Sequence, residues 1–122
     1  MTLFHVRLEL ARSKDFPDGS SLQGYEFTAP LDASGHLDAA GWKANKSACA
    51  VRRFTRGEPD ERGRLVHVGK GWHFDYDAKD TDDDEPVFIL DKHTIKQGEY
   101  LSITEHDGVM RTFKIVSVRA VG

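Results

Sequence analysis

Residues 99–118 read EYLSITEHDGVMRTFKIVSV, and this stretch sets the fold class. At its centre is the step Asp107-Gly108, with runs of β-branched and aromatic residues on both sides. An Asp-Gly step between two such runs is the strongest short-range signal for a β-hairpin, because both residues accept the backbone angles of a tight turn. The stretch therefore predicts a long hairpin and a β-rich protein.

The same two-residue period recurs through the rest of the chain. Alternating or apolar runs, separated by clusters of Gly, Pro, Asn or Asp, mark further strands at 4–10, 25–29, 47–54, 64–68, 72–77 and 87–90. Strands with one apolar face bury it by curling into a barrel or by packing on a second sheet. We predict a mainly β fold, a small barrel or two-sheet sandwich of seven to eight short antiparallel strands, with at most one short helix near 39–44. The expected core is aromatic: Phe4, Phe27, Trp72, Phe74, Tyr76, Phe88 and Phe113.

Composition indicates an ordinary soluble protein. A length of 122 residues fits one domain, and we expect residues 1–122 to form it. Seventeen basic and 20 acidic residues give a net charge of −3, which excludes a surface that attracts polyanions everywhere. The longest apolar run, 87–90, is far shorter than the roughly 18 residues of a membrane span. With a single cysteine, Cys49, and no secretory signal at the N-terminus, we expect a cytoplasmic protein without membrane attachment.

An acidic segment at 75–85 is the strongest candidate for a metal site. Carboxylates at alternating positions can converge on a hard cation such as calcium, which takes six to eight oxygen ligands. The position after Asp84, however, is Glu85, whereas a calcium loop of the helix-loop-helix type has glycine after its third alternating carboxylate. The alternative is a solvated acidic loop, so we expect no obligatory cofactor, with a divalent cation as the exception. The candidate ligands are Asp75, Asp77, Asp80, Asp82 and Asp84.

Basic residues gather in the two strands and the loop before this segment. The candidate binding surface comprises Arg52, Arg53, Arg56 and Arg64. Arginine grips phosphate or carboxylate in a bidentate fork. The carboxylates at 58, 60 and 61 dilute the field, and the nearby aromatic residues alternate as core residues do, so nucleic acid is a disfavoured partner. We expect this surface to meet an acidic one, in this chain or in a second copy.

Other catalytic or metal signals are weak. His67 and His73 can approach each other across a turn, with Asp75 as a third zinc ligand, but no established zinc spacing supports them. Cys49 lies between alanines in a strand-like segment, which is typical of a buried thiol. No nucleophile elbow or phosphate-binding loop is present, so we predict no catalytic residues.

Three stretches resemble a known group of proteins. The hairpin of 98–108 with 113–116, together with 51–54 and 74–77, is similar to segments of small uncharacterised bacterial β-rich proteins with no assigned function. The resemblance implies a compact bacterial β-rich domain and carries over no site residues.

These observations favour binding over catalysis. We expect a non-enzymatic module that binds a protein partner or a second copy of itself, through strand edges or the opposed charged surfaces. The alternatives are a metal-binding module that uses the acidic segment and a nucleic-acid-binding barrel that uses the arginines.

Overall fold

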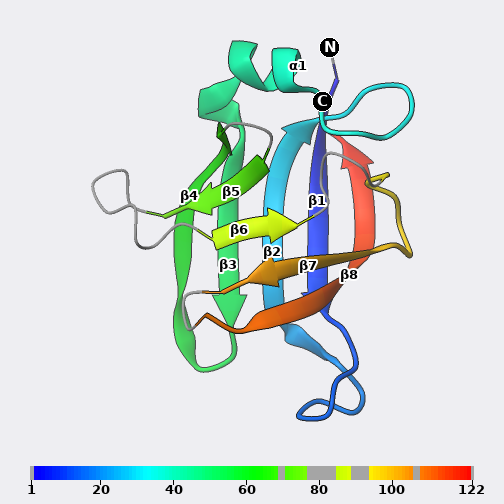
Figure 1. Ribbon diagram of the computed structural model, residues 1–122, viewed down its shortest axis with the longest axis vertical. Coiled ribbons are helices and arrows are strands. Elements are labelled where there is room, and N and C mark those ends of the chain that lie inside the picture. Colours follow the sequence, from blue (N-terminus) through cyan, green and yellow to red (C-terminus); the bar gives the residue numbers. More distant parts are fainter. Residues whose placement is uncertain (1, 69–70, 77–84, 89–93, 106–107, 122) are drawn as a thin grey trace.

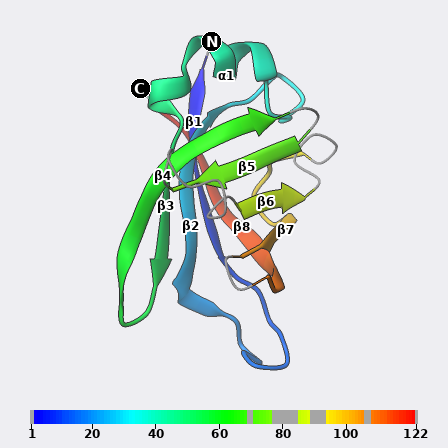
Figure 2. The ribbon, with the colours of Figure 1, turned by 60° about the vertical axis from the view of Figure 1, so that its left-hand side comes forward.

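The computed structural model describes residues 2–68, 71–76, 85–88, 94–105 and 108–121, with the backbone alone at 68 and 85–88. Each strand in this part pairs antiparallel with the next, and the last pairs with the first, which closes a barrel (Figures 1 and 2). The mainly β, antiparallel prediction is confirmed. The strands are β1 (Leu3–Leu10), β2 (Ser20–Pro30), β3 (Ala50–Thr55), β4 (Glu58–Val68), β5 (Gly71–Asp75), β6 (Glu85–Phe88), β7 (Tyr100–Thr104) and β8 (Met110–Ala120).

The hairpin predicted from residues 99–118 is formed by β7 and β8. Their register pairs Tyr100 with Lys114 and Thr104 with Met110. Gly108 has a φ of 79°, a left-handed conformation that favours glycine, and its amide donates to the carbonyl of Glu105 at 2.8 Å. The Asp-Gly signal therefore identified the turn correctly.

Two strands begin earlier than the sequence predicts. β2 starts at Ser20 because its register against β1 jumps between Gly24 and Ser20, which leaves 21–23 as a bulge. β4 starts at Glu58 because the preceding turn is tight, with Gly57 at a φ of 78°. Both segments are polar or charged, so they lack the apolar alternation that marks a half-buried strand.

A short helix covers one end of the barrel, and the β1–β2 loop extends from the other (Figures 1 and 2). The helix α1 (Ala39–Ala44) begins after Asp38, whose carboxylate accepts the amide of Gly41 at 3.0 Å, and the 3-10 turn η1 (Lys46–Ala48) follows it. Trp42 anchors α1 to the barrel, because its indole N–H donates to the carbonyl of Leu65 at 2.7 Å and its ring meets Trp72 edge-on. None of the helices in the described ranges is long and apolar enough to cross a membrane.

Large side chains fill the barrel interior. Tyr25 packs against Phe74 and Phe113 with ring centroids 5.2 and 5.1 Å apart, and Phe27 packs against Phe74 at 5.5 Å. Each large side chain that is fully buried contributes about 1.5–3 kcal/mol, so this set dominates the stability. Four aromatic residues of the predicted core are buried: Phe27, Trp72, Phe74 and Phe113. Phe4 and Tyr76 are half-buried against this core, and the side chain of Phe88 is not among those that the structure describes.

Candidate functional site

Most of the predicted metal ligands lie outside the described residues. These are Asp77, Asp80, Asp82 and Asp84. Asp75 is described: it ends β5, half-buried, opposite Arg64 in the β4–β5 ladder. Within the described ranges, no three His, Cys, Asp or Glu side chains are placed to hold a metal ion. The metal site therefore stays a prediction.

The four arginines of the predicted binding surface have different contacts within the chain. Arg52 forms ion pairs with Glu26 and with Asp60, the latter at 2.8 Å. Arg64 donates to the carbonyl of Ser47, and Arg56 lies exposed in the β3–β4 turn. Arg53, next to Arg52 in an alternating strand, is on the opposite face of the sheet, bound to Glu105.

The outer face of β1, β2 and β3 carries a satisfied polar layer. Glu26 lies at its centre and binds His5 at 2.7 Å, Arg7 at 3.3 Å and Arg52. Burial alone would raise the pKa of Glu26, but the hydrogen bonds from His5 and Arg52 outweigh it and hold the pKa below its ordinary value. The guanidinium groups of Arg7 and Arg52 also cover the ring of Phe54, with their carbons 4.5 and 5.1 Å from its centroid. These cations are therefore engaged within the chain.

Glu105 is the one buried charged residue in the described part, with 4% of its surface exposed. Its carboxylate accepts the hydroxyl of Tyr25 at 2.6 Å, the Nε and Nη2 atoms of Arg53 at 3.1 and 3.0 Å, and Nη1 of Arg111 at 2.9 Å. Burial would lower the pKa of Arg53, yet its interactions with Tyr25 and Glu105 raise it above its ordinary value. This buried cluster joins the β7–β8 turn to β2 and β3. The carboxylate is thus enclosed, and both of its oxygens accept hydrogen bonds from within the chain.

The predicted histidine pair does not form. His67 shares a face of the β4–β5 ladder with Trp72 and stacks on it, with centroids 4.3 Å apart and planes inclined by 28°. His73 lies opposite Val66, on the other face of the same ladder. Cys49 is fully buried, and burial raises the pKa of its thiol, which disfavours the reactive thiolate.

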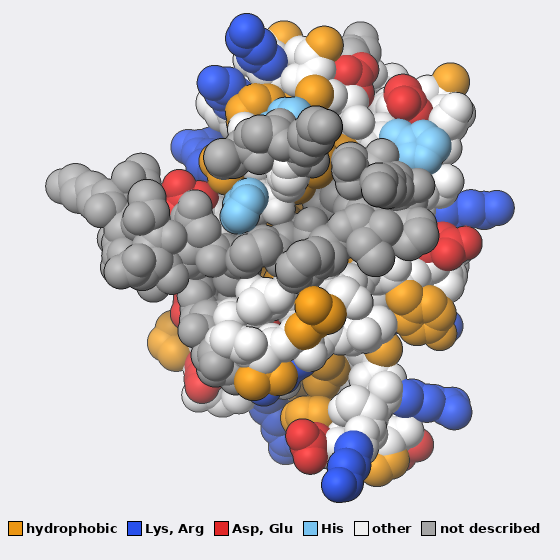
Figure 3. Space-filling view, in the orientation of Figure 1, with side chains coloured by type: hydrophobic (Ala, Val, Ile, Leu, Met, Phe, Trp, Pro, Cys, Tyr) orange, Lys and Arg blue, Asp and Glu red, His pale blue; other side chains and the backbone are white. Residues whose placement is uncertain are grey.

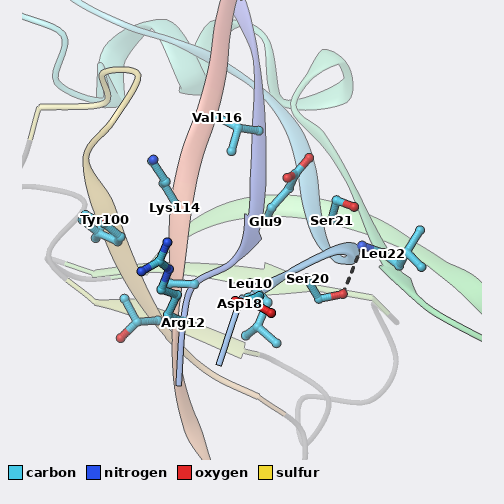
Figure 4. A pocket seen from close by; sticks show the side chains of 13 residues that line it. Glu9, Leu10, Arg12, Asp18, Ser20, Ser21, Leu22, Tyr100, Lys114 and Val116 are labelled. Atoms are coloured by element: carbon cyan, nitrogen blue, oxygen red, sulfur yellow. Dashed lines mark hydrogen bonds between the residues drawn. The ribbon is translucent and has the colours of Figure 1, made fainter. Parts of the chain in front are cut away.

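A groove with a volume of about 940 Å³ runs over the outer face of β1, β2 and β8 (Figure 4). The bulge at 21–23 and the β1–β2 loop form one side of it, and the start of β7 forms the other. Leu22 and Tyr100 line it from opposite sides, and each has 52% of its surface exposed. Of the six large hydrophobic side chains exposed in the described ranges, these are the two that line the groove.

Charges are separated across this groove (Figure 4). Lys114 and Arg12 lie on the side of Tyr100, and Glu9 lies on the other side, where Arg7 holds its carboxylate at 2.8 Å. Neither Arg12 nor Lys114 forms an ion pair with any residue in the described ranges. Figure 3 shows that acidic, basic and apolar side chains mix at the lower end of the molecule, where the β1–β2 loop lies. The groove thus has a cationic wall without being a broad basic field.

Sequence reasoning missed this groove. It predicted no strand between 10 and 25 and placed Tyr100 in an ordinary hairpin strand, and nothing local shows that the two segments meet. The residues at 21–23 lie just before the alternation at 25–29, and they interrupt its two-residue period, which was the available signal for an irregular strand start. No protein-family model, curated protein or solved structure matches this chain.

Proposed function

We propose that this protein is a non-enzymatic binding module and that a protein partner docks in the groove over β1, β2 and β8. The observation that carries the proposal is the pair of half-exposed anchors, Leu22 and Tyr100, on opposite sides of the groove. Tyrosine and arginine are enriched among the residues that dominate binding energy at protein interfaces, and Arg12 lies on the same side as Tyr100.

The shape of the groove favours a chain segment over a small molecule. Its volume is within the roughly 300–1,000 Å³ of ligand pockets, but those pockets enclose most of their ligand within apolar walls. This groove is open, has polar side chains along it and lies outside the barrel. The interior is filled by the aromatic core.

Two other roles receive less support. The polar groups that resemble a catalytic set, Glu105 with Tyr25 and two arginines, are engaged with one another beneath the surface. Self-association through the edges of β1 and β8 is disfavoured, because these two strands pair with each other within the chain. We therefore propose that the partner is a different protein. We also propose that the protein is located in the cytoplasm, because its lone cysteine is buried and unpaired, as is usual in a reducing compartment.

Selection of short random peptides displayed on phage tests the proposal. We expect the selected peptides to shift amide resonances of 9–12, 18–22 and 112–116 in nitrogen-15 spectra. Tyr100→Ser should weaken them by about tenfold or more, because an aromatic anchor carries much of the binding energy. Met110→Ser is the matched control, since Met110 is 55% exposed on the same hairpin and lies outside the groove. Peptides that shift only other regions, or that ignore Tyr100→Ser, would overturn the proposal.

A further inference from the structure

We infer that the segment bound in this groove is an extended peptide whose carboxylate side chains bind Arg12 and Lys114. The inference rests on the proposed function and adds the chemistry of the partner. It starts from these two cations on the side of Tyr100, which form no ion pair within the part of the chain that the structure describes (Figure 4).

The backbone fixes these two cations on one wall. The amide of Ala11, just before Arg12, donates to the carbonyl of Thr112 at 3.0 Å, which ties the start of the β1–β2 loop to β8. Lys114 lies two residues further along β8, opposite Tyr100 in the β7–β8 ladder. Because strand side chains alternate, Thr112 and Lys114 share the outer face, and both line the groove. Lys114 thus lies on a paired strand, and Arg12 lies in the β1–β2 loop one residue after a backbone hydrogen bond to β8.

The opposite wall limits how much negative charge the partner can carry. Glu9 lies directly across the β1–β8 ladder from Lys114, but Arg7 holds its carboxylate, which points away from Lys114 (Figure 4). Asp18 adds a second carboxylate to the groove. A polyanion that filled the groove would meet both acidic groups, and like charges at close range oppose binding. A peptide with carboxylates on one side only avoids this repulsion, which favours a protein segment over nucleic acid.

An extended backbone meets both requirements of the groove. Its side chains alternate in direction, so carboxylates can face Arg12 and Lys114 while the residues between them face the opposite wall. Leu22 and Tyr100 supply apolar contact at the two sides. Serine hydroxyls at 20 and 21 line the same opposite wall as Leu22, where they can hydrogen-bond to polar groups of the partner (Figure 4).

Two matched peptide libraries test the inference. One fixes alternate positions as Asp or Glu, and the other fixes the same positions as Asn or Gln, which keeps the shape and removes the charge. We expect the acidic library to yield groove binders that weaken about fivefold or more in the double variant Arg12→Gln/Lys114→Gln, and that weaken as salt is raised. Lys43→Gln, an exposed lysine on α1 at the other end of the barrel, is the charge-matched control and should leave binding unchanged.

The outcomes separate the inference from the proposed function. If only the amide library yields binders that depend on Tyr100, the groove binds peptides and the carboxylate preference is wrong. If neither library yields groove binders, both proposals fail. Competition for the groove by a single-stranded oligothymidylate, lost in the Arg12→Gln/Lys114→Gln variant, would overturn the peptide assignment in favour of nucleic acid.

Discussion

Replacing Glu105 with glutamine should destabilise the fold by about 3 kcal/mol, because removing one partner of a buried ion pair costs about 3–5 kcal/mol. The carboxylate faces two guanidinium groups and a tyrosine hydroxyl, and the side chain of Arg53 is only 15% exposed. Glutamine keeps one acceptor oxygen but no charge, so Arg53 would remain buried opposite a neutral amide. The loss stays near the low end of the range because Arg53 also interacts with Tyr25.

Urea unfolding followed by tryptophan fluorescence measures this change. Tyr25→Phe removes the hydrogen bond of the hydroxyl to the charged Glu105 and the interaction of that hydroxyl with Arg53, and it should cost at least about 1.5–3 kcal/mol. Glu99→Gln, an exposed glutamate of the same hairpin region, should stay within about 0.5 kcal/mol of the wild type. Combining Glu105→Gln with Arg53→Met should recover part of the loss, since it removes the unpaired charge. A free energy of unfolding for Glu105→Gln within about 1 kcal/mol of the wild type would show that the carboxylate is not a stabilising contact.

Three further expectations follow from other parts of the structure. Gly24→Ala should lower the free energy of unfolding by about 1–3 kcal/mol in urea titrations, because an added Cβ would lie 2.0 Å from the carbonyl oxygen of Leu8 and 3.0 Å from the ring of Phe54; an unchanged midpoint would contradict this packing. Cys49 should react with a thiol reagent at neutral pH only after unfolding, because burial encloses the thiol and raises its pKa; rapid labelling of the native protein would show that it is accessible. The folded-state pKa of Glu26 is lowered, so its stabilising contribution is complete above the ordinary value of 4.5 and is lost as the pH falls through the folded value. The difference in unfolding free energy between the wild type and Glu26→Gln should therefore shrink below about pH 4.5, and a difference that grows there would reverse the assigned sign.

Local pattern was enough to predict the strands and the core. The Asp-Gly step located the β7–β8 hairpin, and alternation identified β1, β5 and four of the buried aromatic residues. The one short helix predicted near 39–44 is α1, and the carboxylate of Asp38 just before it accepts the amide of Gly41. These features depend on neighbours within a few residues, so one sequence contains the information for them.

The groove and the buried cluster depend on contacts between distant segments. Tyr25 and Glu105 are 80 positions apart, and neither shows in its local sequence that it will be a partner of the other. The groove exists only because the bulge at 21–23 and the β1–β2 loop are brought to β8 by closure of the barrel. Arg12 and Lys114 therefore look like ordinary surface cations until the register between β1 and β8 is known.

The pairing of β1 with β8 brings the two ends of the described chain together. The amide of Val121 donates to the carbonyl of Leu3 at 2.8 Å, at the end of the barrel that α1 covers (Figure 1). Every other ladder joins strands that follow each other in the chain, so those hairpins can form early. The β1–β8 ladder joins the first strand to the last, so it can form only after β8 has been synthesised. A circular permutant that joins 121 to 2 and opens the chain at Gly57 would keep every ladder while moving the late step to β3 and β4. We therefore expect the order of assembly to follow the position at which the chain is opened, with the same ladders formed in both arrangements.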